Sequence, residues 1–289
     1  MKRVTRVVGW AFGSLSVLTL LLVALAWIFD FRQSDDALRN EFAGQRVQPT
    51  VHRYHVADRT IRYIETPCLP GKPTVLFVHG APSSLSFFNE FFKDTALLSR
   101  AQLVAVDRPG YGYSDFGRVE PSVVRQAELL QPLIDRYKAS PYLIVVGSSY
   151  GGSVSARLAM NNPGVIDQVV FVSSALGPGL ERTYDISYLV DLEPIKSLTP
   201  PLLRLANDEK LAHQKALEAI LPDWSRITSG ITMLHGLRDE LVYPTNVAFA
   251  KQHLRNAPFK EFILPESRHD IVVNKRDYIA AILLNILPN

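Results

Sequence analysis

Ser149 lies at the centre of the sequence Gly-Ser-Ser-Tyr-Gly-Gly at residues 147–152. An apolar run precedes this sequence at residues 142–146 and a segment with helical spacing follows it, which is the strand, turn and helix context of a G-x-S-x-G motif. Small residues two positions before and after the serine permit a turn so tight that the hydroxyl projects from it. Ser148 lacks this environment because its +2 neighbour is the bulky Tyr150. Ser149 is therefore the predicted nucleophile, and an ordinary glycine-rich turn is the alternative.

A serine hydroxyl is a poor nucleophile at neutral pH, so it needs a histidine to accept its proton and a carboxylate to orient that histidine. The chain has 7 histidines. His52 and His55 lie three residues apart in a predicted strand and therefore face opposite sides, which does not suit a shared metal ion. The chain also lacks an H-E-x-x-H motif, a cysteine cluster, a G-x-x-x-x-G-K loop and a G-x-G-x-x-G loop after the first strand. We therefore expect neither a metal nor a cofactor.

The composition is that of a folded globular chain. Of its 289 residues, 47% are hydrophobic and 20% are charged, and Cys68 is the only cysteine. These values exclude a disordered protein, a polytopic membrane protein and a small disulfide-stabilised scaffold. The net charge of +3 belongs to the first 29 residues, which contain Lys2, Arg3 and Arg6, whereas the remaining 28 basic and 28 acidic side chains balance. We therefore expect no nucleic-acid partner.

Residues 7–29 are an uncharged run of 23 residues rich in leucine, valine and alanine. As a helix this run would be about 34 Å long, enough to cross a bilayer. The three cations before the run place the N-terminus in the cytoplasm by the positive-inside rule. The prediction is a membrane anchor with an extracytoplasmic catalytic domain, periplasmic or extracellular. The alternative is a signal peptide cleaved near Ala26 and a secreted product, but the apolar run continues through residues 27–29 and is long for a signal peptide.

A polar linker is expected at residues 30–50, followed by one domain at residues 51–289. Residues 51–66 alternate polar and apolar side chains on both sides of Asp58-Arg59, which predicts an antiparallel hairpin. Short apolar runs without alternation predict strands buried on both faces, as in a parallel sheet, at 74–78, 103–106, 143–146, 169–172, 231–234 and 261–264. Helical spacing is found at 85–99, 120–138, 150–161, 246–256 and 270–287.

The alternation of strands and helices is interrupted once, at about residues 177–228. This segment contains several prolines and a helical pattern at 203–221 but no strand-like run. An insertion after a sheet strand lies at the carboxyl edge of the sheet, where α/β proteins bind ligands. We predict a small, mainly helical lid there.

Four motifs follow one another along the globular chain. They are H-G-A-P at residues 79–82, D-R-P-G-Y-G-Y-S at 107–114, the turn around Ser149, and Asp239 followed by His269. Together they resemble the α/β-hydrolases over about residues 50–289. The resemblance implies the α/β class and the α/β-hydrolase fold, a mostly parallel, doubly wound sheet with an antiparallel N-terminal hairpin and a helical lid. The transmembrane helix predicted from residues 7–29 would precede this domain. It also implies that serine, acid and histidine follow one another in that order.

By this family order the base follows Ser149, which leaves His213, His235, His253 and His269. Only His269 lies in the loop after the final predicted strand, where the family has its base, so the resemblance assigns that role to His269. His213 lies in a charged stretch of the lid and is predicted on a solvated helix face. His235 and His253 are expected to have packing or surface roles.

The resemblance assigns the acid to Asp239, in a G-x-x-D pattern after the predicted strand at 231–234, with Glu240 as the nearest alternative. The loop after the preceding strand, where some relatives have the acid, is Ser-Ser-Ala at residues 173–175 and has no carboxylate. Asp270 is expected to cap the last helix.

Two backbone N–H groups must stabilise the oxyanion that acyl attack creates. One is expected from Tyr150, after the nucleophile, and the resemblance assigns the other to Ala81 in the H-G-A-P turn, with His79 shaping that loop. Asp107 and Arg108 are expected to form an internal ion pair or to hold a turn rather than to bind substrate.

The sequence departs from the family pattern at two positions. Ser83 follows the H-G-A-P turn where many relatives have glycine, and Arg268 precedes the base where glycine is common. A cation beside the base would disfavour a protonated imidazole.

The chemistry expected from these residues is serine hydrolysis of an acyl bond through an acyl-enzyme. A carboxylic ester of a small molecule, lipids included, is the leading substrate class. The same residues would serve a proline iminopeptidase-like peptidase, a thioesterase, a carbon–carbon bond hydrolase or an acyltransferase, and a non-catalytic binding protein of this fold is the alternative from another class. A serine rather than an aspartate at the turn argues against enzymes that form alkyl-enzyme esters.

Overall fold

The structure is a computed structural model that describes residues 30–67, 71–255 and 257–288. The predicted membrane anchor at residues 7–29 and Cys68 lie outside the described residues. Within the described ranges, no helix is both long enough and apolar enough to cross a membrane.

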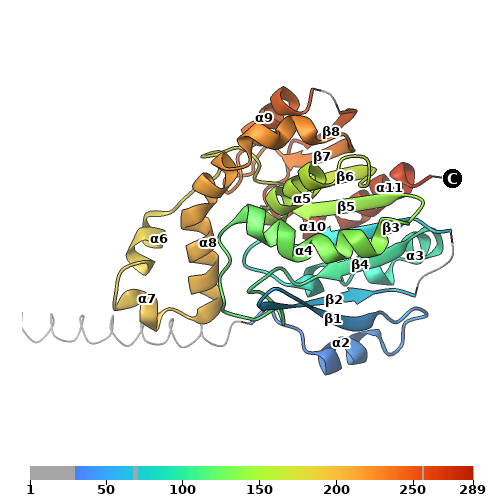
Figure 1. Ribbon diagram of the computed structural model, residues 1–289, viewed down its shortest axis with the longest axis horizontal. Coiled ribbons are helices and arrows are strands. Elements are labelled where there is room, and N and C mark those ends of the chain that lie inside the picture. The colour runs from blue at the N-terminus through green and yellow to red at the C-terminus, as the bar shows by residue number, and fades with distance from the viewer. Residues whose placement is uncertain (1–29, 68–70, 256, 289) are drawn as a thin grey trace, which may run out of the picture.

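The described chain is built on one sheet of eight strands in the order β1-β2-β4-β3-β5-β6-β7-β8 (Figure 1). The strands are β1 (Thr50–Val56), β2 (Arg59–Glu65), β3 (Thr74–Val78), β4 (Gln102–Val106), β5 (Leu143–Ser148), β6 (Gln168–Val172), β7 (Gly230–Gly236) and β8 (Phe259–Leu264). β1 and β2 form the predicted antiparallel hairpin, β2 pairs antiparallel with β4, and all other neighbours are parallel. The hairpin turn comprises Ala57 and Asp58, one residue earlier than predicted, because Arg59 already pairs with Val56.

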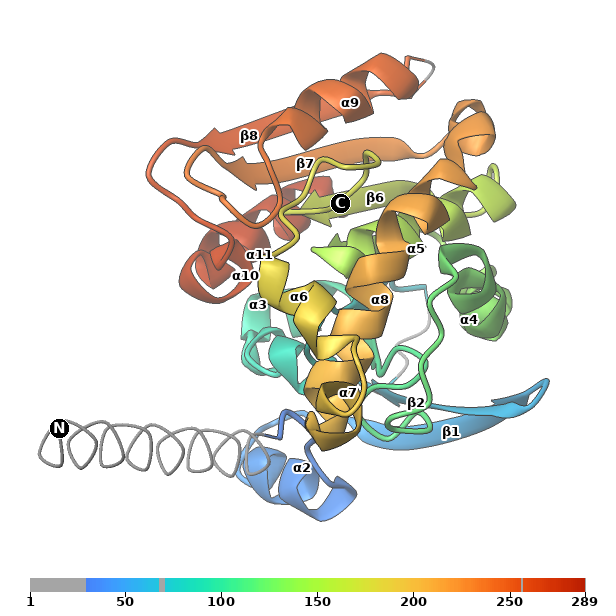
Figure 2. The ribbon, with the colours of Figure 1, turned by 90° about the vertical axis from the view of Figure 1, so that its left-hand side faces the viewer.

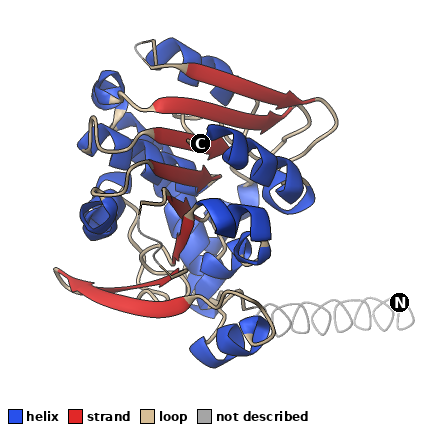
Figure 3. Cartoon of the chain, turned by 90° about the vertical axis from the view of Figure 1, so that its right-hand side faces the viewer, coloured by secondary structure: helices blue, strands red, loops and turns tan. Residues whose placement is uncertain are grey.

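Helices cover both faces of this sheet (Figure 3). The α-helices are α2 (Asp35–Phe42), α3 (Thr95–Arg100), α4 (Val123–Tyr137), α5 (Tyr150–Asn161), α6 (Asp185–Val190), α7 (Ile195–Leu198), α8 (Pro201–Glu218), α9 (Thr245–His253), α10 (Ile271–Asn274) and α11 (Arg276–Ile286), and the 3-10 helices are η1 (Leu85–Phe88), η2 (Phe91–Lys93) and η3 (Leu221–Arg226). Helices α4, α5 and α9 and η3 pack on one face. Helices α2, α3, α10 and α11 with η1 and η2 pack on the other.

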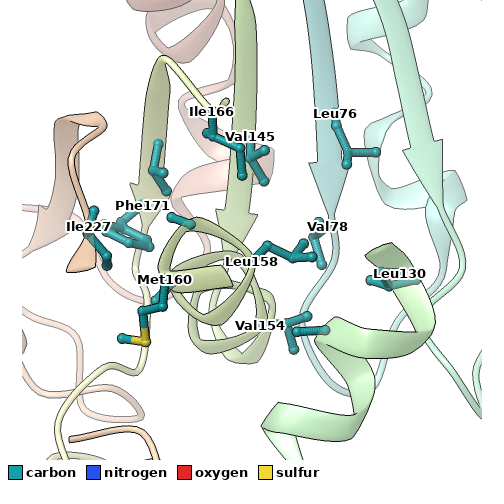
Figure 4. Packing of buried hydrophobic residues seen from close by; sticks show 14 of the residues in the cluster. Leu76, Val78, Leu130, Val145, Val154, Leu158, Met160, Ile166, Phe171 and Ile227 are labelled. Carbon is teal, nitrogen blue, oxygen red and sulfur yellow. The ribbon is translucent and has the colours of Figure 1, made fainter. Parts of the chain in front are cut away.

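Because both faces are covered, successive side chains of a central strand are all buried. In β3, Leu76 and Val78 face the layer that contains Val154 and Leu158 of α5 (Figure 4), whereas Phe77 faces the opposite layer. This packing explains why the strands are continuous apolar runs in the sequence.

Two predicted helices are interrupted. Residues 85–99 form η1, η2 and α3 in succession, because the carboxylate of Asp94 accepts hydrogen bonds from the amides of Ala96 and Leu97 and so begins a new helix. The last helical segment is divided into α10 and α11 at Lys275, whose backbone leaves the helical region at φ −125°. The segment expected as a linker contains α2, and its Leu38 and Phe42 are buried in the core.

The lid, residues 177–228, follows β6 and contains α6, α7, α8 and η3 (Figure 2). Its longest helix is α8, which begins with Pro201 at its first position, where the missing amide hydrogen is not needed. The helical pattern predicted at 203–221 is confirmed, but the helix begins two residues earlier and ends three residues earlier than predicted.

Candidate active site

Ser149 occupies a strained turn between β5 and α5. Its backbone has φ 53° and ψ −122°, a conformation that non-glycine residues rarely adopt. The turn is tight on both sides: a Cβ on Gly147 would lie 2.6 Å from the Ser155 Oγ, and a Cβ on Gly151 would lie 2.2 Å from the Val78 carbonyl oxygen. The small residues of the motif are thus required by close packing, as the sequence predicts.

Three loops bring Ser149, His269 and Asp239 together. The His269 Nε2 lies 3.0 Å from the Ser149 Oγ, and its Nδ1 lies 2.8 Å from the Asp239 Oδ2. With the carboxylate accepting from Nδ1–H, Nε2 is free to accept from the serine hydroxyl. The ring is about one-quarter exposed, and Asp239 is buried. The arrangement can transfer a proton from Ser149 to a histidine whose tautomer is set by Asp239.

Asp239 is held in its ionised form. Its Oδ1 accepts hydrogen bonds from the amides of Leu241 and Val242, at 3.0 and 2.9 Å. Burial disfavours the charge, but the hydrogen bond and the electrostatic attraction that His269 supplies, together with the Val242 amide, outweigh it, so the pKa of Asp239 lies below its usual value.

The nearest alternatives to these residues lie elsewhere. Glu240, the alternative acid, is exposed, and its carboxylate lies 4.0 Å from the Arg182 guanidinium. Asp270 is exposed and occupies the N-cap position of α10, but its side chain does not make the capping bond that we expected and instead accepts from Asn274. Arg268 is also exposed, unlike the half-buried His269 beside it.

Ala81 and Tyr150, the predicted oxyanion donors, line one cavity together with Ser149 and His269. The loop before Ala81 approaches the nucleophile closely, because a Cβ on Gly80 would lie 2.9 Å from the Ser149 Cβ. The positions of Ala81 and Tyr150 beside the Ser149 hydroxyl suit residues whose backbone amides stabilise an oxyanion.

The loop that contains Ala81 is held by Arg108. The Arg108 guanidinium donates to the carbonyl oxygens of His79 and Gly80, at 2.8 and 3.1 Å, and its backbone amide donates to the His79 Nε2 at 2.9 Å. Glu209 of α8 accepts from the same guanidinium through both carboxylate oxygens, at 2.9 and 3.1 Å. Arg108 and Glu209 are fully buried. Although burial disfavours the charge, the Glu209 carboxylate raises the pKa of Arg108.

Asp107 and Arg108 therefore have the predicted interior, loop-holding role, but the ion pair predicted between them is not formed, because each pairs with a more distant residue. Asp107 pairs with Arg62 at 3.2 Å, and Arg108 pairs with Glu209. Glu209 could have been found from its spacing, since it lies on the same stripe of α8 as the buried Leu205.

The prediction that His213 lies on a solvated face is wrong. His213 is fully buried, its ring stacks on Tyr150 at a centroid distance of 4.2 Å, and its Nδ1 lies 2.7 Å from the Glu181 Oε1. Its Nε2 lies 2.9 Å from the Ser153 Oγ. His213 lies on the same stripe of α8 as Leu205 and Glu209. This stripe faces the domain, although several residues near His213 in the sequence are charged.

Three other histidines are used in packing. His253 stacks on Phe249, at 4.1 Å between ring centroids. The Nε2 of buried His235 donates to the Val242 carbonyl oxygen at 2.9 Å. His79 is fully buried, and both of its ring nitrogens have partners: Nδ1 lies 2.7 Å from the Gly80 carbonyl oxygen, and Nε2 accepts from the Arg108 backbone amide. Burial lowers the pKa of His235, and burial together with Arg108 holds the pKa of His79 well below the usual 6.5.

These two neutral histidines predict acid-sensitive stability. Each takes up a proton on unfolding when the pH is below about 6.5, so the free energy of unfolding should fall by about 1.4 kcal/mol per pH unit for each of them. The loss begins as the pH falls through the unfolded-state pKa, because the folded-state pKa values are the lower ones. Denaturant unfolding of wild type and His235→Asn across this pH range measures the slope, which should be shallower in the variant. His55→Asn, at an exposed site, is the matched control, and an unchanged slope in His235→Asn would contradict the assignment.

A cavity of about 490 Å³ opens in front of Ser149, between the sheet edge and the lid. Its walls are mainly apolar and come from the H-G-A-P turn, from α6 and α8, and from the loop after Asp239. The polar side chains include Glu181 and Lys210, which pair at 2.8 Å. The described part of the chain has no group of three or more histidine, cysteine, aspartate or glutamate side chains that could hold a metal ion.

Comparison with known proteins identifies the family. The model of the alpha/beta hydrolase family matches residues 75–281. A relative from Pseudomonas putida, the dihydrolipoyllysine-residue acetyltransferase component of the acetoin cleaving system, is 26% identical over 269 residues, which cover 85% of this chain and 71% of the relative.

Solved structures share the fold. The 2-hydroxy-6-oxo-6-phenylhexa-2,4-dienoate hydrolase from Rhodococcus sp. strain RHA1 has a TM-score of 0.66 at 18% identity, over 83% of this chain and 99% of that chain. A membrane phospholipase A has a TM-score of 0.62 at 19% identity, over 99% of both chains. With the family match and the sheet order, these likenesses lead to one conclusion: this chain belongs to the alpha/beta hydrolase family.

Proposed function

We propose that this protein hydrolyses carboxylic esters by a serine mechanism. The observation that supports the proposal most directly is the chain of hydrogen bonds from Asp239 through His269 to Ser149, which ends at the cavity in front of the nucleophile. The mainly apolar cavity walls favour an ester with an aliphatic or other apolar acyl group.

In the proposed first step, the Ser149 oxygen attacks the ester carbonyl carbon while His269 takes the hydroxyl proton. The amides of Ala81 and Tyr150 stabilise the negative oxygen of the tetrahedral intermediate. The C–O bond to the alcohol then breaks, and His269 gives its proton to the departing oxygen. In the second step His269 deprotonates a water molecule, which attacks the acyl carbon. The bond from that carbon to the Ser149 oxygen then breaks, His269 returns the proton to this oxygen, and the carboxylic acid leaves.

Acyl transfer is the second candidate, and the relative that is named as an acetyltransferase component favours it. The chemistry differs only in the second step, in which a bound alcohol or thiol replaces water. Adding an acceptor alcohol and measuring the ratio of transesterified product to free acid distinguishes the two, because a hydrolase forms mostly the acid.

We also propose that the uncharged run at residues 7–29 attaches the chain to a membrane, with the catalytic domain outside the cytoplasm. The cationic side chains that precede the run support this orientation.

Activity-based labelling tests the proposed ester hydrolysis. A fluorophosphonate should label wild type at Ser149 and should fail to label Ser149→Ala, because the reagent requires an activated serine. A panel of soluble esters with graded acyl chains should then show turnover, with a preference set by the cavity. Folded wild type that resists labelling and leaves the panel intact would indicate the non-catalytic binding protein instead.

A further inference from the structure

The lid has an apolar surface on the side away from the cavity. Helices α6 and α7 contain no buried residue, although most of their side chains are apolar. Among the apolar side chains of this segment that do not line the cavity and are exposed to water are Tyr188 at 59%, Leu189 at 50%, Leu192 at 57% and Ile195 at 43%. We call these four residues the lid apolar face.

Such a surface is unusual for a helix in water. A surface helix normally buries its apolar side and exposes a polar one. In α6, however, Ile186 and Val190 line the cavity, while Tyr188 and Leu189 belong to the lid apolar face. The helix is thus apolar on both sides, and its cavity side lies only one helix diameter, about 10 Å, from the lid apolar face. Exposed apolar groups gathered in this way mark an interaction surface.

The described chain begins beside the base of the lid. The guanidinium of Arg32 lies 4.0 Å from the centre of the Phe116 ring, and Phe116 packs against the small cluster of Tyr111, Leu202 and Leu205, the last two of which lie at the start of α8. Two residues separate α7 from α8. The uncharged run at residues 7–29, which is long enough to cross a bilayer, therefore joins the domain at the end of the lid that contains α7.

The charges around the lid apolar face indicate what it contacts. The acidic residues Asp185, Asp191 and Glu193 flank it. Lys196 is already engaged, since its Nζ lies 2.8 Å from both Asp191 and Asp208. Acidic residues and an already paired lysine offer little attraction to the anionic headgroups of a membrane. Binding of the lid apolar face to a membrane must therefore come from burial of its apolar side chains.

We propose that the lid apolar face inserts into the boundary between headgroups and acyl chains of a bilayer, so that the cavity receives its ester substrate directly from the membrane. The part that concerns the substrate rests on the proposed ester hydrolysis, whereas insertion of the face does not.

A fluorescence experiment on the full chain tests insertion without relying on catalysis. In a Cys68→Ser background, Leu189→Cys is labelled with an environment-sensitive fluorophore and mixed with phosphatidylcholine vesicles that contain a spin-labelled lipid. The label should shift to the blue and be quenched by the lipid, in wild type and in Ser149→Ala alike. The effect should persist at about 1 M salt, where the Debye length is only about 3 Å.

The matched control is Val273→Cys on α10, which is 58% exposed but lies away from α6 and α7 (Figure 1). Its label should remain in water. Equal quenching at both positions, or none at Leu189, would overturn the proposal. A blue shift at Leu189 that depends on protein concentration and shows no lipid quenching would assign the face to a second copy of the chain and would equally overturn it.

An activity comparison tests delivery of the substrate. The variant with Tyr188→Ser, Leu189→Ser and Leu192→Ser should hydrolyse a soluble short-chain ester within about twofold of wild type, because these residues do not line the cavity. Its hydrolysis of a long-chain ester embedded in vesicles should fall by at least about tenfold, since three apolar side chains no longer enter the membrane. Val273→Ser should change neither rate.

The two activities separate the possible failures. Equal loss on both esters would mean that the lid apolar face only supports the lid, and equal retention on both would mean that it does not dock. A wild type that is inactive on the soluble ester but inserts by fluorescence would refute the proposed hydrolysis and leave the docking intact.

Discussion

Replacing Ser149 by alanine should lower kcat/KM for a soluble ester by about 10⁴- to 10⁶-fold, because the covalent step disappears while the oxyanion donors and the cavity remain. The residual rate should come from substrate held near the amides of Ala81 and Tyr150. The measurement is steady-state hydrolysis by purified wild type and variant, with circular dichroism to show that both are folded.

Ser148→Ala is the matched control, because it removes a hydroxyl from the adjacent residue at the end of β5. It should retain activity within a few-fold, since the His269 Nε2 contacts the Ser149 hydroxyl. Comparable turnover by Ser149→Ala and wild type would refute the assignment of the nucleophile, and loss of activity in both variants would point to damage of the turn.

Replacing Glu209 by leucine should destabilise the protein by about 3–5 kcal/mol, because it leaves the fully buried Arg108 guanidinium without its counter-charge. The folded fraction should also lose about 10²- to 10³-fold in kcat, since Arg108 holds the loop that presents the Ala81 amide. Thermal and denaturant unfolding measure the first effect, and single-turnover hydrolysis by folded protein measures the second.

A double variant separates the two effects. Arg108→Met combined with Glu209→Leu removes both charges, so most of the lost stability should return. The low kcat should persist, because the carbonyl oxygens of His79 and Gly80 still lack their donor. A double variant with full activity would show that Arg108 does not position this loop. Glu266→Leu, which breaks an exposed ion pair with Arg238, is the control and should cost less than about 1 kcal/mol.

These contacts divide the lid into two parts. Helix α8 is attached to the domain by buried polar side chains, with Glu209 on Arg108 and His213 on Tyr150. Helices α6 and α7 have no such attachment, because none of their residues is buried. We therefore expect any change of lid shape to occur in α6 and α7, next to the cavity, while α8 stays with the loop that contains Ala81.

Much of the site could be predicted from the sequence because its chemistry depends on local patterns. The strained turn at Ser149 requires small residues at fixed offsets, and those offsets are visible without a structure. The parallel strands were visible as continuous apolar runs, because helices cover both of their faces. Since the family order then leaves few histidines and carboxylates in the right loops, His269 and Asp239 could be named in advance.

What could not be predicted depends on contacts between distant segments. Arg108 and Glu209 are separated by 101 positions, and nothing local shows that a loop after β4 meets the inner stripe of α8. The sequence around His213 predicts a solvated position for the same reason, because its charged neighbours lie on the other sides of the helix. The burial of a polar side chain depends on which surfaces pack together, so only the tertiary structure decided where these residues lie and that α6 has apolar side chains on both sides.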